Sequence, residues 1–291
     1  MENIWVLFAV ISAFSLATSD ALTKKALTSH NEFVIAWLRL LFSLPLLIAA
    51  FFFVPIPELN RDFYIIFLIA LPLEIIAIVL YIKALKISPM SLTLPFLSLT
   101  LLFLIIISYI LLGETVSTRG AAGIVLIVAG SYMLNIRQFK KGIFEPFIAI
   151  TREKGSVYMI LVSLIYSLTA SLGKMAIELS SPIFFGSVFF TAVVIAFTPL
   201  ALLKNKGGFK ELNGQVFKSA LLPGIFYSFM IISHVIALSL TKVAYMISVK
   251  RLSLLIAVVY GYYLFSESGI SERLLGSVLM LTGFVLIVVF G

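Results

Sequence analysis

The second half of this chain repeats part of its first half. The stretch Ala84–Leu134 aligns without a gap with Ala237–Ile287, at a constant offset of 153 residues in a chain of 291. Twelve of the 51 aligned pairs are identical. The pairs that apolar composition explains least are Glu114 with Glu267, Gly123 with Gly276 and Gly130 with Gly283. The chain is therefore predicted to fold as two tandem copies of one unit.

Composition indicates where the chain folds. Apolar residues make up 62% of the chain and charged residues 12%, whereas a soluble domain has about a quarter of its residues charged. We predict an integral membrane protein in contact with the lipid bilayer. The net charge of +8 then indicates loops that face anionic lipid, and no nucleic-acid partner. With no cysteine and only two histidines, we predict no metal site and no cofactor.

Ten stretches are long and apolar enough to cross a membrane. A hydrocarbon core of roughly 30 Å needs about 20 residues of helix. Backbone groups in lipid must hydrogen bond within the segment, so each stretch is predicted to be an α-helix. The predicted spans are 4–22, 33–53, 63–82, 91–112, 119–136, 156–176, 182–203, 217–240, 243–265 and 272–290.

A polar segment midway along the chain separates two sets of five spans. We predict a first repeat at 1–136, a basic linker at 137–155 and a second repeat at 156–291. Because five is odd, the second copy enters the membrane from the opposite side. The predicted fold is an all-α membrane protein with ten transmembrane helices in two inverted five-helix repeats. Such duplications are typical of transporters, whose sites lie between the copies.

Several features together resemble one family. A glutamate ends spans four and nine, a helix with two glycines seven residues apart follows each, and span one contains the polar run 19–25. With the duplication, these features resemble the EamA-like ten-helix branch of the drug/metabolite transporter superfamily. The second copy departs from the pattern, since it has Ser266 where the first has Gly113.

The resemblance has functional implications. It implies a secondary transporter, often an exporter of amino acids or other small metabolites, in the cell membrane. It also implies a substrate cavity lined mainly by helices one, three, four, six, eight and nine.

The dipeptide Lys250-Arg251 lies inside span nine. A charge near the bilayer centre costs roughly 2.5–3.5 kcal/mol on insertion scales. The aligned residues are Leu97 and Ser98, so the fold itself does not demand these cations. Adjacent helical residues point about 100° apart, so we expect one cation to face the cavity and bind a carboxylate or phosphate. The alternatives are structural pairing with Glu74 or backbone carbonyls, and snorkelling.

Other candidate substrate contacts lie inside the spans. Glu74 is in the middle of span three, where it can bind substrate, couple transport to protons, or form an ion pair. His234 lies inside span eight and can bind substrate or only pack. Tyr81, Tyr166, Tyr227 and Tyr245 can stack on a flat substrate, although aromatic residues in membrane helices mostly pack or mark interfaces.

Span one ends in a polar stretch. Ser19 is predicted to contact substrate. Asp20 and Lys24 are four residues apart on one helix face, which predicts an internal salt bridge. The alternative for both is a role in coupling or gating.

The sequence leaves the orientation in the membrane open. Lys and Arg residues near the predicted span ends number 14 on the side of the linker and four on the side of the termini. The positive-inside rule places the linker in the cytoplasm and the termini outside. The family resemblance implies the opposite.

As a whole, the sequence predicts a carrier for a small polar or zwitterionic metabolite, such as an amino acid, that works by alternating access as a monomer or a homodimer. A membrane-embedded enzyme acting on a lipid-linked substrate and a channel are the alternatives. The sequence shows neither the clustered ligands typical of such an enzyme nor a repeated ring of one polar residue type.

Overall fold

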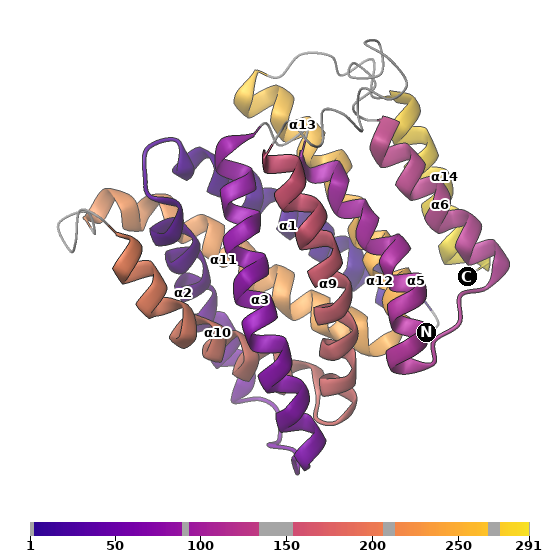
Figure 1. Cartoon of the computed structure of the whole chain (residues 1–291), viewed down its shortest axis with the longest axis horizontal. Coiled ribbons are helices and arrows are strands. Elements are labelled where there is room, and N and C mark those ends of the chain that lie inside the picture. The colour runs from indigo at the N-terminus through magenta and orange to yellow at the C-terminus, as the bar shows by residue number, and fades with distance from the viewer. Residues whose placement is uncertain (1–2, 89–92, 134–153, 206–212, 267–273, 291) are drawn as a thin grey trace.

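The computed structural model describes residues 3–88, 93–133, 154–205, 213–266 and 274–290, and these residues form helices and no strand (Figure 1). The first half contains α1 (Ile4–Leu27), α2 (Glu32–Phe51), α3 (Arg61–Ile87), the short 3-10 helix η1 (Leu94–Ser98), α5 (Leu99–Leu112) and α6 (Thr118–Met133). The second half contains α9 (Lys154–Glu178), α10 (Pro182–Lys204), α11 (Gly214–Leu240), α12 (Val243–Lys250), α13 (Ser253–Phe265) and α14 (Leu274–Phe290). The prediction of an all-α protein is confirmed for the described residues.

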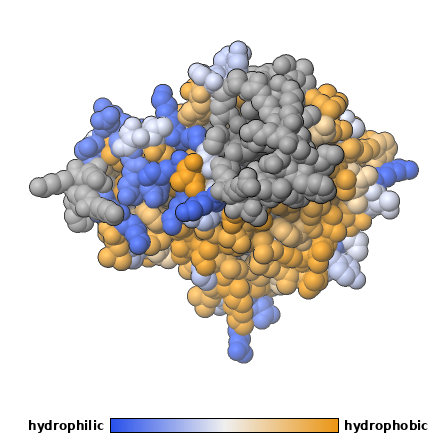
Figure 2. All heavy atoms as spheres, turned by 45° about the horizontal axis from the view of Figure 1, so that its top comes forward, coloured by the Kyte–Doolittle hydropathy of each residue, from blue (hydrophilic) through white to orange (hydrophobic). Residues whose placement is uncertain are grey.

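Eight helical segments within the described residues are long and apolar enough to cross a membrane. Helices α6 and α14 are apolar but have 16 and 17 residues, about 24 and 26 Å of helix. The spans predicted there, 119–136 and 272–290, extend beyond the described residues. Much of the face shown in Figure 2 is apolar, and apolar side chains such as Leu68, Ile110 and Ile195 are each exposed by 66–69%. Such a surface requires lipid around it, so this is a multi-pass membrane protein.

Short side chains set where several helices begin and end. Asn31, Asn60 and Asn213 each accept a hydrogen bond from a backbone N–H in the next helical turn, as N-cap residues do. Gly113 (φ +68°) directly follows the last residue of α5, and the aligned Ser266 (φ +53°) directly follows the last residue of α13. The left-handed conformation costs a residue with a Cβ roughly 1–2 kcal/mol. Both copies thus keep the same turn despite the serine.

The two halves contact each other through pairs of helices, with one helix of each pair from each half. Helix α1 packs on α11 and α3 packs on α9, so the first helix of each half contacts the third helix of the other. The second helices of the halves pack together as α2 and α10. The last helices pack together as α6 and α14, at the opposite edge of the bundle (Figure 1). A two-fold axis between two copies of one unit produces this arrangement.

Helices α2 and α10 run antiparallel. Trp37 Nε1 donates to Thr198 Oγ1 at 2.9 Å, and Ser187 Oγ donates to Leu47 O at 2.8 Å. The residue number on α10 therefore falls as the number on α2 rises.

Helices α6 and α14 are also antiparallel and pack closely through their glycines. Gly123 lies against Gly283, and Gly130 lies against Gly276. Small residues let helix backbones approach each other in lipid, where the hydrophobic effect does not drive helix association.

Adding a side chain at this glycine contact is expected to destabilise the protein. A Cβ at Gly130 would lie 2.6 Å from Gly276 O, so the helices would have to separate. We expect Gly130→Ala to lower the free energy of unfolding by about 1–3 kcal/mol. Gly214→Ala is the control, because a Cβ there meets no atom of the described residues within 4 Å. Unfolding in mixed detergent micelles measures both, and equal stability would contradict the close contact.

The linker predicted at 137–155 lies outside the described residues, except for its last two. Lys154 and Gly155 belong to α9, which corrects the predicted boundary. The charge at Lys154 suggested a loop, but this side chain is exposed at the first turn of the helix, where a lysine can extend to water.

Candidate functional site

A cavity of about 130 Å³ lies inside the bundle, and helices of both halves line it. Most of its wall is apolar, with one group of charged, hydroxyl and imidazole side chains. The polar lining residues are Arg39, Glu74, Tyr81, Thr100, Tyr166, Thr169, Tyr227, His234, Lys250 and Arg251. This is the arrangement expected of a small-molecule site, in which a few polar groups orient the ligand within an apolar wall.

Lys250 and Arg251 lie where a membrane helix is interrupted. Helix α12 ends at Lys250 and α13 begins at Ser253. At the aligned place in the first half, η1 gives way to α5, so both copies depart from regular α-helix at one position. We expected only one of the two cations to face the cavity. Both line it. The Arg251 N–H still bonds to Ile247 O at 3.1 Å, so the helical step between the two residues is kept, and it is the length of the two side chains that brings both to one cavity.

The contacts of these cations are mostly with neutral groups. Lys250 Nζ lies 3.3 Å from His234 Nδ1, and Arg251 Nη2 donates to Thr100 Oγ1 at 2.9 Å. The buried Arg251 Nε has no hydrogen-bond partner within the part of the chain that the structure describes. Among the described residues, no carboxylate lies within 4.0 Å of either cation. Arg251, which is buried, and Lys250, which is partly buried, therefore line the cavity without a counter-charge among the described residues.

Glu74 lines the same cavity from α3. Its side chain is 8% exposed, and Thr169 on α9 lines the cavity together with it. The ion pairs found among the described residues do not include Glu74. The pairing with Lys250 or Arg251 considered from the sequence is thus not formed, and the cavity presents the carboxylate and the two cations separately.

Asp20 and Arg39 form a buried ion pair beside the cavity. Arg39 Nη1 lies 3.0 Å from Asp20 Oδ1, Tyr81 donates a hydrogen bond to Asp20 Oδ2, and the Arg39 guanidinium lies 4.1 Å from the Tyr227 ring centroid. The prediction that Asp20 pairs with Lys24 was wrong. Asp20 is 2% exposed and Arg39 of α2 is its partner, a tertiary contact that helical spacing does not reveal.

Lys24 lies away from the cavity, at the end of α3. Its Nζ donates to Leu85 O at 2.9 Å and to Ser88 O at 2.6 Å. The last carbonyls of a helix lack intrahelical donors and carry partial negative charge. Lys24 therefore caps α3.

Ser19 and Tyr245, both predicted substrate contacts, do not line the cavity. Ser19 Oγ donates to Pro223 O at 2.8 Å and so connects α1 to α11. Tyr245 OH accepts a hydrogen bond from Ser117 N–H at 2.9 Å, near one end of the bundle. The predicted residues that do line the cavity are Glu74, Tyr81, Tyr166, Tyr227, His234, Lys250 and Arg251.

Three polar lining residues, Arg39, Thr100 and Thr169, were absent from the predicted site. Arg39 carried a signal, since it is a charged residue within a span. Thr100 and Thr169 carry no signal in the sequence, because threonine is common in membrane helices.

Comparison with known proteins identifies the family. The sequence model of the EamA-like transporter family matches residues 3–136 and again residues 153–289. The chain belongs to the EamA-like transporter family. This finding confirms both the predicted resemblance to the drug/metabolite transporter superfamily and the internal duplication.

A solved structure supports the fold of this EamA-like protein. It is titled "Crystal structure of protein", is 14% identical, and has a TM-score of 0.79 with 100% of both chains covered. At this identity the likeness concerns the fold alone. No curated protein matches the sequence.

Proposed function

We propose that this EamA-like protein is a secondary transporter that carries a small metabolite with a negatively charged group, and that Lys250 and Arg251 bind that group. The observation that carries the proposal is a pair of cations, Arg251 buried and Lys250 partly buried, that line the cavity without a carboxylate partner among the described residues. Buried charge without a counter-charge is unfavourable, so an anionic ligand would stabilise the site. Arginine can grip a carboxylate through two parallel hydrogen bonds.

A zwitterion such as an amino acid fits the same site. Glu74 can accept hydrogen bonds from an ammonium group while the cations hold the carboxylate. Tyr81 and Tyr166 lie with their ring centroids 6.3 Å apart and line the cavity, where they can contact the body of the ligand. His234, next to Lys250, adds a further polar contact.

We propose that a proton gradient, or the exchange of one substrate for another, supplies the energy for transport. Glu74 is the first candidate for a proton carrier because it faces the cavity without an ion-pair partner among the described residues. Asp20 is the second, through its contacts with Arg39 and Tyr81. Lys24 is a candidate gating residue at the end of α3.

We further propose ten membrane spans in two inverted repeats that expose the cavity alternately. The antiparallel pairs α2–α10 and α6–α14 support the inversion. An axis that relates two antiparallel equivalent helices must be perpendicular to them, and therefore lies in the membrane plane. The interrupted helices at the cavity fit this plan, since inverted-repeat carriers place their sites at such breaks.

Family membership favours a carrier over the two alternatives, a membrane-embedded enzyme and a channel. We propose the plasma membrane as its location and export as its direction, following the usual role of the family.

Counterflow in proteoliposomes tests the function. A thermal-shift screen of amino acids and other small anions first selects a cargo. We then expect uptake of the labelled cargo to saturate, and unlabelled cargo trapped inside to accelerate it several-fold, since a carrier returns faster when loaded. Flux that rises linearly with concentration would indicate a channel. Product formation without net movement would indicate an enzyme.

A further inference from the structure

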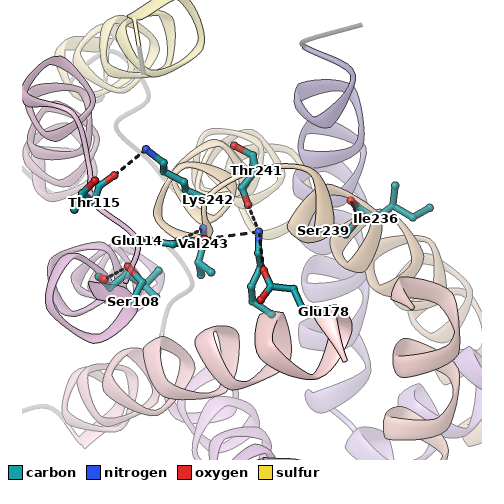
Figure 3. Close-up of polar contacts among 11 residues, drawn as sticks. Ser108, Glu114, Thr115, Glu178, Ile236, Ser239, Thr241, Lys242 and Val243 are labelled. Atoms are coloured by element: carbon teal, nitrogen blue, oxygen red, sulfur yellow. Dashed lines mark hydrogen bonds and ion pairs between the residues drawn. The ribbon is translucent and has the colours of Figure 1, made fainter. Parts of the chain in front are cut away.

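At one end of the bundle, polar contacts join the two halves (Figure 3). The loop that follows α5 belongs to the first half, and the turn between α11 and α12 belongs to the second. Glu114 Oε2 accepts a hydrogen bond from Val243 N–H at 2.8 Å, and Lys242 Nζ donates to Thr115 O at 2.9 Å. We call this set the clamp; its members are Glu114, Thr115, Lys174, Thr241, Lys242 and Val243.

Lys174 of α9 lies at the centre of the clamp. Its Nζ donates to Thr241 O at 2.7 Å and lies 3.7 Å from Glu114 Oε1. The Lys174 and Glu114 side chains are 9% and 13% exposed. The pair thus joins the halves where little water reaches, and an ion pair in such surroundings is screened less than one on an open surface.

The clamp lies directly beyond the cavity wall. Gly173 lines the cavity and precedes Lys174, while Leu238 lines it one turn before Thr241. Ile247 lines the cavity less than two turns after the start of α12 at Val243. On α9, α11 and α12, residues that line the cavity therefore lie within about one helical turn of residues of the clamp. At this end, a path from the cavity has to pass between the two halves that the clamp joins.

We propose that the clamp is a gate of the transport cycle, and that the Lys174–Glu114 pair separates whenever the cavity opens toward this end. The inference rests on the proposed function, in which the halves move relative to each other. Glu114 has two separable roles here. Its oxygen caps the start of α12, which a neutral amide oxygen can also do, whereas its attraction to Lys174 needs the charge.

Two substitutions test the charge of the pair separately from the capping role of Glu114. Glu114→Gln keeps an acceptor for Val243 N–H and removes the charge, and Lys174→Met removes the cation while keeping an apolar stem. We expect each to raise the ratio of open to closed gate by about three- to tenfold, the range for loss of a partly buried ion pair. The effect of the double variant is expected to fall short of the sum of the two single effects, because the pair can be lost only once.

Spin-label distances measure this ratio without a cargo. Nitroxides can be attached through Tyr109→Cys and Leu240→Cys, which are exposed positions in opposite halves and outside the clamp. Because the chain has no cysteine of its own, no other position is labelled. A longer distance should gain population in both gate variants. Lys86→Met is the control, since it removes a cation that pairs with Glu32 outside the clamp. Unchanged distances in both gate variants would overturn the proposal.

Cross-linking connects the gate to transport. We expect a cleavable thiol cross-linker between Thr115→Cys and Lys242→Cys to stop cargo uptake, and cleavage to restore it. The control pair Glu32→Cys and Lys86→Cys lies within the first half and should not block uptake. Uptake that continues through a cross-linked clamp would contradict a gate at this place. If the distances respond but no cargo is carried, the proposed function fails and the gating contact stands.

Discussion

Arg251→Gln is expected to reduce cargo uptake into proteoliposomes by about 30-fold or more, the range for truncating one partner of a buried charge contact. The Arg251 side chain is 4% exposed, lines the cavity and has an unused Nε donor. Glutamine removes both the charge and the fork that can hold a carboxylate. Lys250→Gln should act in the same direction, because the two cations face one volume.

Matched variants separate binding from a general effect of charge. Arg119, at the start of α6, lies over the Phe290 ring and away from the cavity. Arg119→Gln therefore removes a cation outside the site, and this variant should transport normally. Arg251→Lys keeps the charge but loses the bidentate geometry, so an intermediate rate is expected. Normal uptake by both Arg251→Gln and Lys250→Gln, at wild-type amounts of protein, would show that neither cation binds the cargo.

Asp20→Asn should strongly destabilise the folded protein. It leaves Arg39, 4% exposed, without its carboxylate partner, and breaking a buried ion pair costs about 3–5 kcal/mol. Tyr81 can still donate to the amide oxygen of asparagine, so loss of the charge is the main change. The free energy of unfolding in mixed detergent micelles measures the effect and needs no cargo.

A double substitution tests the physical reason. When both charges are removed, no uncompensated ion remains, so Asp20→Asn with Arg39→Met should be more stable than Asp20→Asn alone. A double variant whose loss equals the sum of the two single losses would mean that the residues act independently. The pair would then not explain the destabilisation.

Much of the fold could be predicted because a membrane restricts the choices. Backbone groups in lipid must bond within each segment, so apolar stretches translate directly into helices. The duplication was readable because Glu114 and the paired glycines recur at one offset. The same glycines form the α6–α14 contact, which tandem copies of one unit place on their equivalent helices.

The residues that line the cavity were predicted only in part. Lys250, Arg251 and Glu74 stood out because charge is rare in membrane spans. The helix break at Lys250 had no local signal, since the second copy has neither proline nor glycine there, whereas the first copy has Pro95 in η1. The Asp20–Arg39 pair and the place of Tyr245 in contact with Ser117 depend on tertiary packing, which periodicity does not report.

Side-specific labelling of one cavity cysteine tests alternating access most directly. Ala170 lines the cavity and the chain has no other thiol, so Ala170→Cys can be probed with a membrane-impermeant reagent applied to either face of oriented vesicles. We expect labelling from each face in turn, with cargo slowing both reactions. Labelling from a single face under every condition, with or without cargo, would contradict a cavity that opens alternately between the two halves.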